Sequence, residues 1–298
     1  MITQRVKNRK SGLQPTTSLR VVEAIAQLAR RLGMGCVNPL FLHESQHVSV
    51  RLLPYEVVAR AMRVSAPEAT TRSTLELDIA RHLVGNGAPV AGPAADWPGG
   101  PHIQDGFVIT LWEFVEHVAA NGDDPRHVSE AANALRRVHL ALSDYRGELP
   151  SFWLKLDRCD HLLQNEASTP ALGPIDRAFL RSTYGGLRKT VTRIPFEPVP
   201  IHGDAHLGNV LMTPQGARWN DLEDVSLGPR EWDVVWLPKA DLAQFEPMNQ
   251  DLLSAFHYLR SLCASVWCWA RYDVPEKREA AEYHLEYLRA ELGSRASS

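Results

Sequence analysis

The chain has 298 residues, of which 44% are hydrophobic and 22% charged, and its formal net charge at pH 7 is -3. A chain of this length buries about three quarters of the surface that it exposes when unfolded, so its core needs no disulfide or structural metal. The small net charge gives no electrostatic attraction to nucleic acid or to an anionic membrane, and neither is an expected partner.

The cysteines and the N-terminus favour a cytoplasmic protein. Cys36, Cys159, Cys263 and Cys268 are scattered without the Cys-x-x-Cys spacing of a zinc or redox site, so we expect reduced, mostly buried thiols. The first twelve residues, MITQRVKNRKSG, are basic but lack the apolar stretch of a secretory signal, and no run of about 18 apolar residues follows. We expect a monomer or a weak dimer.

The first part of the chain predicts a small β-rich unit with an inserted helix. Residues 1–17 are polar and basic, which is typical of a loose arm, and a helix capped by Ser18 should end at Gly33. Two β-type runs, 48–53 and 56–62, predict a hairpin. A second helix should run from Pro67 to Gly85, followed by a loop to residue 100 and a strand at 107–115 that is buried on both faces.

From residue 123 onward the periodicity favours helices. Ser129 should cap a helix that carries Leu135, Val138 and Leu142, and amphipathic helices are expected at 249–271 and 275–292. Two short strands, near residues 210–212 and near Trp219, are expected between them, next to a polar cluster in the middle of the chain.

That polar cluster carries the chemistry. It reads His202-Gly203-Asp204-Ala205-His206-Leu207-Gly208-Asn209, with Asp221 twelve residues later and Asp233 twelve beyond that. Carboxylates crowded between apolar strands lose hydration, and this is costly unless a cation or a reacting proton uses them. Carboxylate and amide oxygens suit Mg²⁺, which binds one or two protein carboxylates together with waters and substrate phosphates.

The run is similar to the catalytic loop and metal-binding segment of the aminoglycoside phosphotransferase and choline kinase-like family, whose pattern is His-Gly-Asp-x-His-x-x-Asn followed by a metal aspartate. The resemblance implies a protein-kinase-like, two-lobed α+β fold. A small antiparallel β-sheet lobe with one helix would precede a larger, mainly α-helical lobe. The chain would then divide into an arm (1–17), a nucleotide-binding lobe (18–112) and a catalytic and acceptor-binding lobe (113–298).

The resemblance also implies a role for each matching residue. Asp204 would accept or orient the proton of an acceptor hydroxyl, while Asn209 and Asp221 would hold Mg²⁺. His202 and Asp233 would brace the loop. The implied reaction moves the γ-phosphoryl of ATP or GTP to a hydroxyl of a small molecule such as an aminoglycoside-like antibiotic, a sugar or an amino alcohol.

The first lobe carries its own matches to a kinase. Arg60, at the end of Val57-Val58-Ala59-Arg60, stands where many kinases have a lysine that contacts the nucleotide phosphates, and Glu76 would hold it from the following helix. Arginine keeps the charge and can contact phosphate with two donors. The backbone groups of Glu113 and Val115, at the linker between lobes, would bind the purine.

Three departures from the family pattern motivate an alternative, a catalytically inactive nucleotide-binding protein. The turn His43-Glu44-Ser45-Gln46-His47 contains no glycine where a glycine-rich phosphate loop would lie. Asn220 replaces the usual apolar residue before the metal aspartate, and Leu222 replaces an aromatic one. A second alternative is a metal-dependent hydrolase that uses His202, Asp204 and His206, although no third His or Cys at a suitable spacing completes a zinc site.

Several residues allow more than one interpretation. Arg60 and Glu76 could form an exposed ion pair, and a core stripe explains Cys263, Val266, Trp267 and Ala270. Phe256, Trp267 or Trp269 could floor the acceptor pocket. The acidic residues Glu223, Asp224 and Glu231 could attract a polycationic acceptor or belong to a solvated loop.

Overall fold

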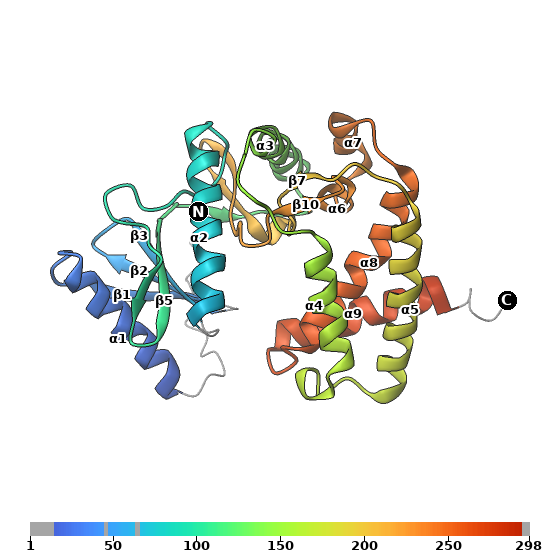
Figure 1. Cartoon of the computed structure of the whole chain (residues 1–298), viewed down its shortest axis with the longest axis horizontal. Coiled ribbons are helices and arrows are strands. Elements are labelled where there is room, and N and C mark those ends of the chain that lie inside the picture. Colours follow the sequence, from blue (N-terminus) through green and yellow to red (C-terminus); the bar gives the residue numbers. More distant parts are fainter. Residues whose placement is uncertain (1–14, 45–46, 63–65, 294–298) are drawn as a thin grey trace.

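The first half of the chain folds around an antiparallel β-sheet. The computed structural model describes residues 15–44, 47–62 and 66–293. Five strands pair in the order β1-β2-β3-β5-β4, next to helices α1 and α2 (Figure 1). Their bounds are α1 Pro15–Arg31, β1 Asn38–Glu44, β2 His47–Leu53, β3 Val57–Met62, α2 Ala66–Gly85, β4 His102–Gln104 and β5 Phe107–Glu113.

Several predicted elements of this half are confirmed. The hairpin is β2–β3, with Val50 opposite Ala59 in its register. Strand β5 is buried at its five central positions, as expected, although it ends at Glu113. The predicted N-cap at Ser18 is wrong, because α1 begins at Pro15, where the fixed backbone of proline suits the first helical turn. The edge strands β1 and β4 were not predicted.

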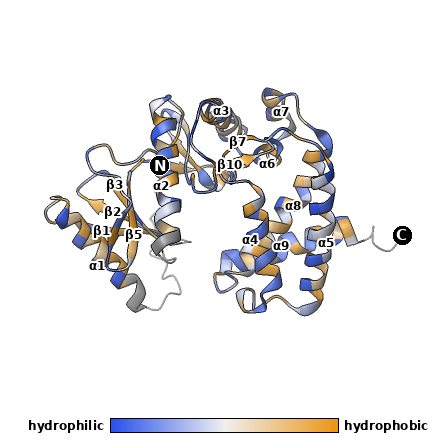
Figure 2. Cartoon of the chain, viewed as in Figure 1, coloured by the Kyte–Doolittle hydropathy of each residue, from blue (hydrophilic) through white to orange (hydrophobic). Residues whose placement is uncertain are grey.

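The core of the sheet lies between the strands and α1. Val21, Ile25 and Leu28 of α1 are buried against Val50 and Ala59 of the hairpin. Figure 2 shows hydrophobic residues concentrated on β2, β3 and β5. The helical stripe expected from the sequence therefore packs on the sheet, so α1 belongs to this lobe in addition to α2.

The second half is mainly helical. Its long helices are α3 Pro125–Leu142, α4 Trp153–Gln164, α5 Pro174–Arg193, α8 Gln250–Trp269 and α9 Pro275–Leu292. Shorter elements are β6 Val118–Ala119, β7 Val199–Ile201, β8 Val210–Thr213, β9 Gly216–Trp219, β10 Ser226–Gly228, α6 Glu231–Val234 and α7 Lys239–Leu242. Figure 1 shows α4, α5, α8 and α9 on the side opposite the sheet, with α3 between the two halves.

The predicted helix at Ser129 begins earlier than expected. The Asp124 side chain accepts a hydrogen bond from the Arg126 amide and caps α3, so the Ser129 cap is wrong and Ser129 lies inside the helix. The helices near 249–271 and 275–292 are confirmed as α8, capped by Asn249, and α9. The strands predicted near residues 210–212 and near Trp219 are confirmed as β8 and β9.

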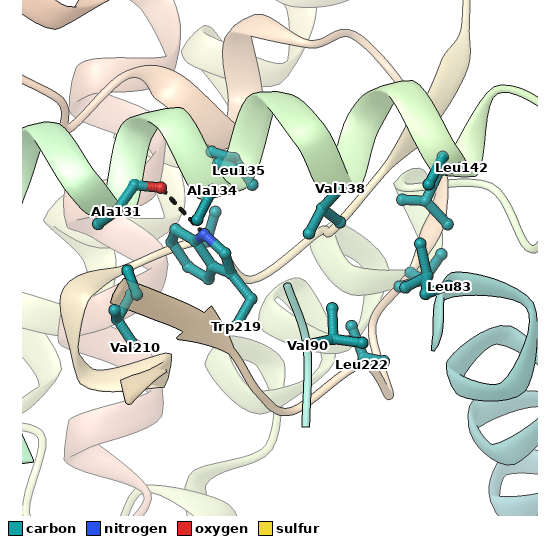
Figure 3. Close-up of a cluster of buried hydrophobic side chains, with 14 of the residues drawn as sticks. Leu83, Val90, Ala131, Ala134, Leu135, Val138, Leu142, Val210, Trp219 and Leu222 are labelled. Atoms are coloured by element: carbon teal, nitrogen blue, oxygen red, sulfur yellow. Dashed lines mark hydrogen bonds between the residues drawn. The ribbon is translucent and has the colours of Figure 1, made fainter. Parts of the chain in front are cut away.

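A shared core joins the two halves. Leu77 and Leu83 of α2 lie in the same buried cluster as Leu135 and Val138 of α3. Trp219 of β9 fills this cluster, and its indole N–H donates to the Ala131 carbonyl at 3.0 Å (Figure 3). A separate cluster, which contains Phe256 and Trp232, fills the space between α4, α5, α8 and α9. The lobes therefore share buried apolar surface.

The cysteines are mostly buried, as expected. Cys159, Cys263 and Cys268 are buried, Cys36 is exposed, and none of the four forms a disulfide. Within residues 15–44, 47–62 and 66–293, no helix combines the length and the apolar character needed to cross a bilayer.

Candidate active site

The polar cluster forms a loop between β7 and β8. Strand β7 pairs with β10, which places the loop beside the segment that follows Asp221. Gly203 has a φ of +80°, and a Cβ there would overlap the carbonyl oxygen of Asp224. Only glycine allows the loop to approach this segment so closely.

The Asp233 side chain binds the backbone at the start of the loop. Its carboxylate accepts the amide N–H groups of His202 at 2.6 Å and Gly203 at 2.9 Å, and it lies 2.7 Å from His139 Nε2. Burial raises the pKa of Asp233, but the bond from His139 and the charges around it outweigh burial and leave the pKa below its usual value. An ionised carboxylate therefore ties the loop to α3.

Both ring nitrogens of His202 are engaged inside the protein. Nε2 lies 3.1 Å from the Asn220 carbonyl oxygen, and Nδ1 accepts the Asp204 amide at 3.4 Å. Burial lowers the pKa of this fully buried ring, despite the opposing charge of Asp233. A neutral His202 with its proton on Nε2 satisfies both contacts, so neither nitrogen is open to a metal ion.

Asp204 lies among cations and amide donors. Lys155 Nζ donates to its Oδ1 at 2.6 Å, and His206 Nε2 lies 3.4 Å from Oδ2. The buried guanidinium of Arg260 is 3.9 Å from Oδ1. Burial raises the pKa of Asp204, but Lys155, His206 and Arg260 together hold it well below its usual range, so the carboxylate is ionised at neutral pH.

Asn209 joins Asp204 to the segment that carries Asp221. Its side-chain Nδ2 donates to the Asp204 carbonyl at 3.0 Å and to Asp204 Oδ2 at 3.2 Å. Its backbone carbonyl accepts the Asn220 amide at 2.9 Å, which fixes the residue before Asp221. Asp221 has a φ of +64°, a left-handed conformation that is uncommon outside glycine and often accompanies function.

The oxygens of Asn209 and Asp221 fit a hard divalent cation. Because the Asn209 amide nitrogen is the donor to Asp204, its side-chain oxygen faces away from that bond, and Asp221 is about one third exposed. One carboxylate, one amide oxygen and the phosphates of a substrate suit Mg²⁺. Among the residues that the structure describes, no group of three or more His, Cys, Asp or Glu residues could hold a metal ion.

Arg60 and Glu76 form a buried pair that reaches Asp221. Arg60 Nη1 donates to Glu76 Oε1 at 2.7 Å, and Arg60 Nη2 donates to Asp221 Oδ1 at 3.0 Å. The Glu76 side chain is 3% exposed, so the interpretation as a solvated surface pair is wrong. Burial raises the pKa of Glu76, partly offset by Arg60. Strand β3, helix α2 and the Asp221 segment therefore meet at one guanidinium.

A second set of ionisable side chains lies beside this pair. Glu223 contacts Arg72 Nη2 at 3.1 Å and His47 Nε2 at 3.4 Å, and His47 Nδ1 lies 3.2 Å from Arg60 Nη2. Burial, with the charge of Asp221, raises the pKa of Glu223 to about 8. Burial, with Arg60 and Arg72, lowers the pKa of His47 to about 2, so its ring is neutral.

The solvated-loop interpretation of the acidic residues is therefore wrong. Glu223 is buried beside Arg72 and His47 of the first half of the chain. Asp224 pairs with Lys155 at 2.7 Å and with Arg158 at 2.6 Å. Glu231 accepts the Asn249 amide at 2.8 Å next to the start of α8. These contacts are internal to the protein.

Glu113 and Val115 lie apart from this cluster, at the end of β5. The Glu113 side chain accepts from the Gly92 amide at 2.6 Å and from Arg218 at 2.5 Å, and its backbone amide donates to the Gly92 carbonyl. The Val115 carbonyl receives His117 Nδ1 at 2.7 Å. Of the turn at residues 43–47, His43 and Glu44 end β1 and His47 begins β2, whereas residues 45–46 lie outside the described residues.

Of the aromatic residues proposed for an acceptor pocket, Trp267 contacts Lys155, which binds the loop. Phe256 is fully buried between Phe152 and Trp232, so it belongs to the core. Trp269 is 6% exposed and stacks on Tyr272. Trp267 is half-buried, with its ring centre 4.8 Å from Lys155 Nζ. A hollow of about 430 Å³ between α5 and α8, lined by Leu187 and Tyr258 among others, includes none of the residues around Asp204.

Three residues of the site that the sequence did not reveal come from helices. Lys155, His139 and Arg72, on α4, α3 and α2, each bind a carboxylate of the cluster from a distant part of the chain. No motif surrounds them. A charged or polar residue on the buried face of a helix would have indicated such a role. The sequence alone does not show which face of each helix is buried.

The chain matches the family model described as "Phosphotransferase enzyme family" over residues 41–274. No curated protein sequence matches the chain. Among solved structures, it is similar to the amicoumacin kinase hAmiN in complex with AMP-PNP, Ca²⁺ and Ami (TM-score 0.66, 13% identity, covering 94% of this chain and 97% of that one).

Two further structures share the fold. They are the choline kinase LicA from Streptococcus pneumoniae (TM-score 0.65, 13% identity, covering 92% and 99%) and the GDP complex of aminoglycoside 2'-phosphotransferase-IIIa (TM-score 0.60, 14% identity, covering 93% and 99%). At such identities the likeness establishes the α+β fold with an antiparallel N-terminal sheet and a helical second lobe. The family match adds the activity, and the chain belongs to the phosphotransferase enzyme family.

Proposed function

We propose that the protein transfers the γ-phosphoryl group of ATP or GTP to a hydroxyl of a small molecule, with Mg²⁺ as cofactor. The observation that carries the proposal is the set of contacts that joins three oxygen-bearing side chains, those of Asp204, Asn209 and Asp221. Asn209 binds Asp204 directly at 3.2 Å, and its backbone fixes Asn220 next to Asp221. Arg60, held by Glu76, reaches the same Asp221 at 3.0 Å.

Asp204 would act on the acceptor hydroxyl. Its pKa is held low, so its main contribution is to orient the hydroxyl and to receive its proton late, as suits a loose phosphoryl-transfer transition state. His202 and Asp233 would keep the loop in place. Asn209 and Asp221 would hold Mg²⁺, which when bound supplies charge neutralisation at the nucleotide phosphates.

The nucleotide would lie between the lobes. Arg60, positioned by Glu76, would contact its phosphates, and the backbone of Glu113 and Val115 would bind the purine, a contact that does not select ATP over GTP. In this proposal residues 18–112 form the nucleotide-binding lobe and residues 113–298 the catalytic and acceptor-binding lobe. An aminoglycoside-like antibiotic, a sugar or an amino alcohol remain the candidate acceptors.

A specific observation favours one alternative, a nucleotide-binding protein without turnover. Arg60 pairs with Asp221 at 3.0 Å, so an internal cation already contacts the proposed metal ligand. If this pair persisted with nucleotide present, Mg²⁺ would not bind Asp221. Nucleotide-dependent thermal stabilisation without turnover on any acceptor, water included, is the result that this alternative expects.

A nucleotide-consumption screen tests the proposal. Purified protein with Mg²⁺ and either ATP or GTP is offered aminoglycosides, macrolides, choline-like amines, sugars and nucleosides, and release of the nucleoside diphosphate is measured. We expect at least one acceptor to accelerate release. Zinc-dependent cleavage of a phosphate ester or amide without nucleotide would instead support the hydrolase.

Two variants separate the roles. Asp204→Asn should lower turnover by about 10²–10⁴-fold while Mg²⁺-nucleotide binding persists. Asp221→Ala should remove the Mg²⁺-dependent part of nucleotide affinity, measured by calorimetric titration with and without Mg²⁺. Unchanged turnover in Asp204→Asn would show that the catalytic assignment is wrong.

A further inference from the structure

Lys155 is a buried cation on α4 that no sequence motif marks. It lies far from the catalytic loop in sequence, yet its ammonium group contacts that loop directly. We infer that Lys155 is a positioning residue that fixes the Asp204 carboxylate for phosphoryl transfer. The inference rests on the proposed function and adds a residue from outside the loop and its metal segment.

The hydrogen bonds of Lys155 account for all of its donors. Nζ donates to Asp204 Oδ1 at 2.6 Å, to Asp224 Oδ2 at 2.7 Å and to the Gly203 carbonyl at 3.1 Å. An ammonium group has three N–H donors and no acceptor, so these bonds leave none for a phosphate or an acceptor. Its effect on the reaction must therefore pass through Asp204.

The partners of Lys155 are themselves held. Asp224 also binds Arg158 at 2.6 Å, and the Gly203 carbonyl also accepts the Trp232 indole N–H at 2.8 Å. The neighbouring Leu156 is fully buried in the core between α4 and α8. The ammonium group of Lys155 is thus held in place both by its hydrogen-bond partners and by the packed helix that carries it.

The hydrogen bond from Lys155 gives the two carboxylate oxygens of Asp204 different environments. Oδ1 receives Lys155, whereas Oδ2 faces Asn209 Nδ2 at 3.2 Å and His206 Nε2 at 3.4 Å. The Arg260 guanidinium, 3.9 Å from Oδ1, is too distant for a hydrogen bond. Without Lys155 the carboxylate can rotate about its side-chain torsions, and a misplacement of about 1 Å can cost about 100-fold in rate.

The test compares Lys155→Met in the normal chain and in the Asp204→Asn chain. Turnover is measured as diphosphate release from Mg²⁺-ATP and Mg²⁺-GTP with the acceptor that is fastest in the screen above, water included. In the normal chain we expect kcat to fall about 100-fold, with the KM for nucleotide within about twofold. In the Asp204→Asn chain, the same change should have no further effect, because a residue that acts through Asp204 has nothing left to position.

Two further variants keep the test sharp. Lys189→Met, an exposed lysine on α5, is the matched control and should leave kcat unchanged. Asp224→Asn removes the opposing anchor of Lys155 and should lower kcat about tenfold, again only when Asp204 is present; it decides the question if Lys155→Met does not fold. An equal loss of kcat with and without Asp204, an unchanged kcat, or a loss confined to KM would each overturn the inference.

The two proposals fail in different ways. If Asp204→Asn lowers turnover as expected while Lys155→Met and Asp224→Asn do not affect it, only the positioning role is wrong. If the normal chain turns over no acceptor, or if Asp204→Asn is fully active, the proposed function is wrong and the role of Lys155 falls with it.

Discussion

At the scale of single residues, each carboxylate of the site has a partner from another element. Lys155 binds Asp204, Arg60 binds Asp221 and His139 binds Asp233. Burial of an ion costs several kcal/mol, which a well-placed partner offsets. Removal of one partner therefore costs more than the pair itself contributes, because the other charge stays buried.

Asp233→Asn should reveal this cost as a loss of stability. The asparagine amide cannot accept both loop N–H groups and also contact His139, so we expect the free energy of unfolding at pH 7 to fall by about 3–5 kcal/mol. Urea denaturation at pH 7 measures the loss. A change below about 1 kcal/mol would show that the loop does not depend on this carboxylate.

The same variant carries a pH dependence of defined sign. Because the pKa of Asp233 is lowered in the folded protein, its stabilisation is fully present above the unfolded-state value of about 3.9 and is lost as the pH falls through the folded value. The gap in unfolding free energy between the normal chain and Asp233→Asn should thus be constant from pH 7 to pH 5 and narrow below about pH 4. A gap that narrows above pH 5 would contradict the assignment.

Gly203→Ala should damage the loop, whereas Gly186→Ala should not. A Cβ at Gly203 would overlap the backbone of Asp224 at a positive φ, so we expect turnover to be lost and the melting temperature to fall. Gly186 lies inside α5 with nothing within 4 Å of a Cβ, and alanine there should stabilise the protein by about 0.5–1 kcal/mol. Equal effects of the two substitutions on melting would contradict the close approach.

At the scale of elements, patterns in the sequence predicted those with strong periodicity or clear boundaries. The β2–β3 hairpin, β5, α2, α8 and α9 were predicted within a few residues. Helix α4 was missed because Lys155 occupies a buried position and interrupts its apolar stripe. Strand β1 was missed because it is an exposed edge strand, so burial imposes no alternation on its residues.

The site shows the same division between local and distant information. The loop residues and Asp221 were predictable because one short motif contains them. Lys155, His139, Arg72 and His47 were not, since each reaches the site through packing between helices or strands far apart in the chain. Their roles depend on the relative placement of elements, which a local pattern does not encode.

The corrected start of α3 and the observed cap of α8 give a test at this scale. Asn249 accepts the Asp251 and Leu252 amides at 3.0 and 3.1 Å, so Asn249→Ala should lower the free energy of unfolding by about 1 kcal/mol. Ser129→Ala, inside α3, should change it by less than about 0.5 kcal/mol. A comparable loss in Ser129→Ala, measured by urea denaturation, would restore Ser129 as a cap.

At the scale of the whole molecule, the boundary proposed at residue 112 cuts through a shared buried cluster, although each half also has a cluster of its own. Helix α2 precedes the boundary, yet Leu77 and Leu83 pack with α3 and β9, and Arg60 and Arg72 bind carboxylates of the second half. A nucleotide between the lobes would therefore contact parts that already depend on each other for stability. We expect the lobes to unfold together.

Leu83→Ala tests this coupling. Leu83 is fully buried in the shared cluster, so its truncation should cost about 2–5 kcal/mol through lost burial and the cavity left behind (Figure 3). In the normal chain and in Leu83→Ala alike, circular dichroism and tryptophan fluorescence should report the same single urea transition. The midpoint of this transition should be lower in the variant. Leu140→Ala, at an exposed position on α3, is the control and should shift it little. Two separate transitions, with only one moved by Leu83→Ala, would mean that the lobes unfold independently and that the contacts of α2 do not couple them.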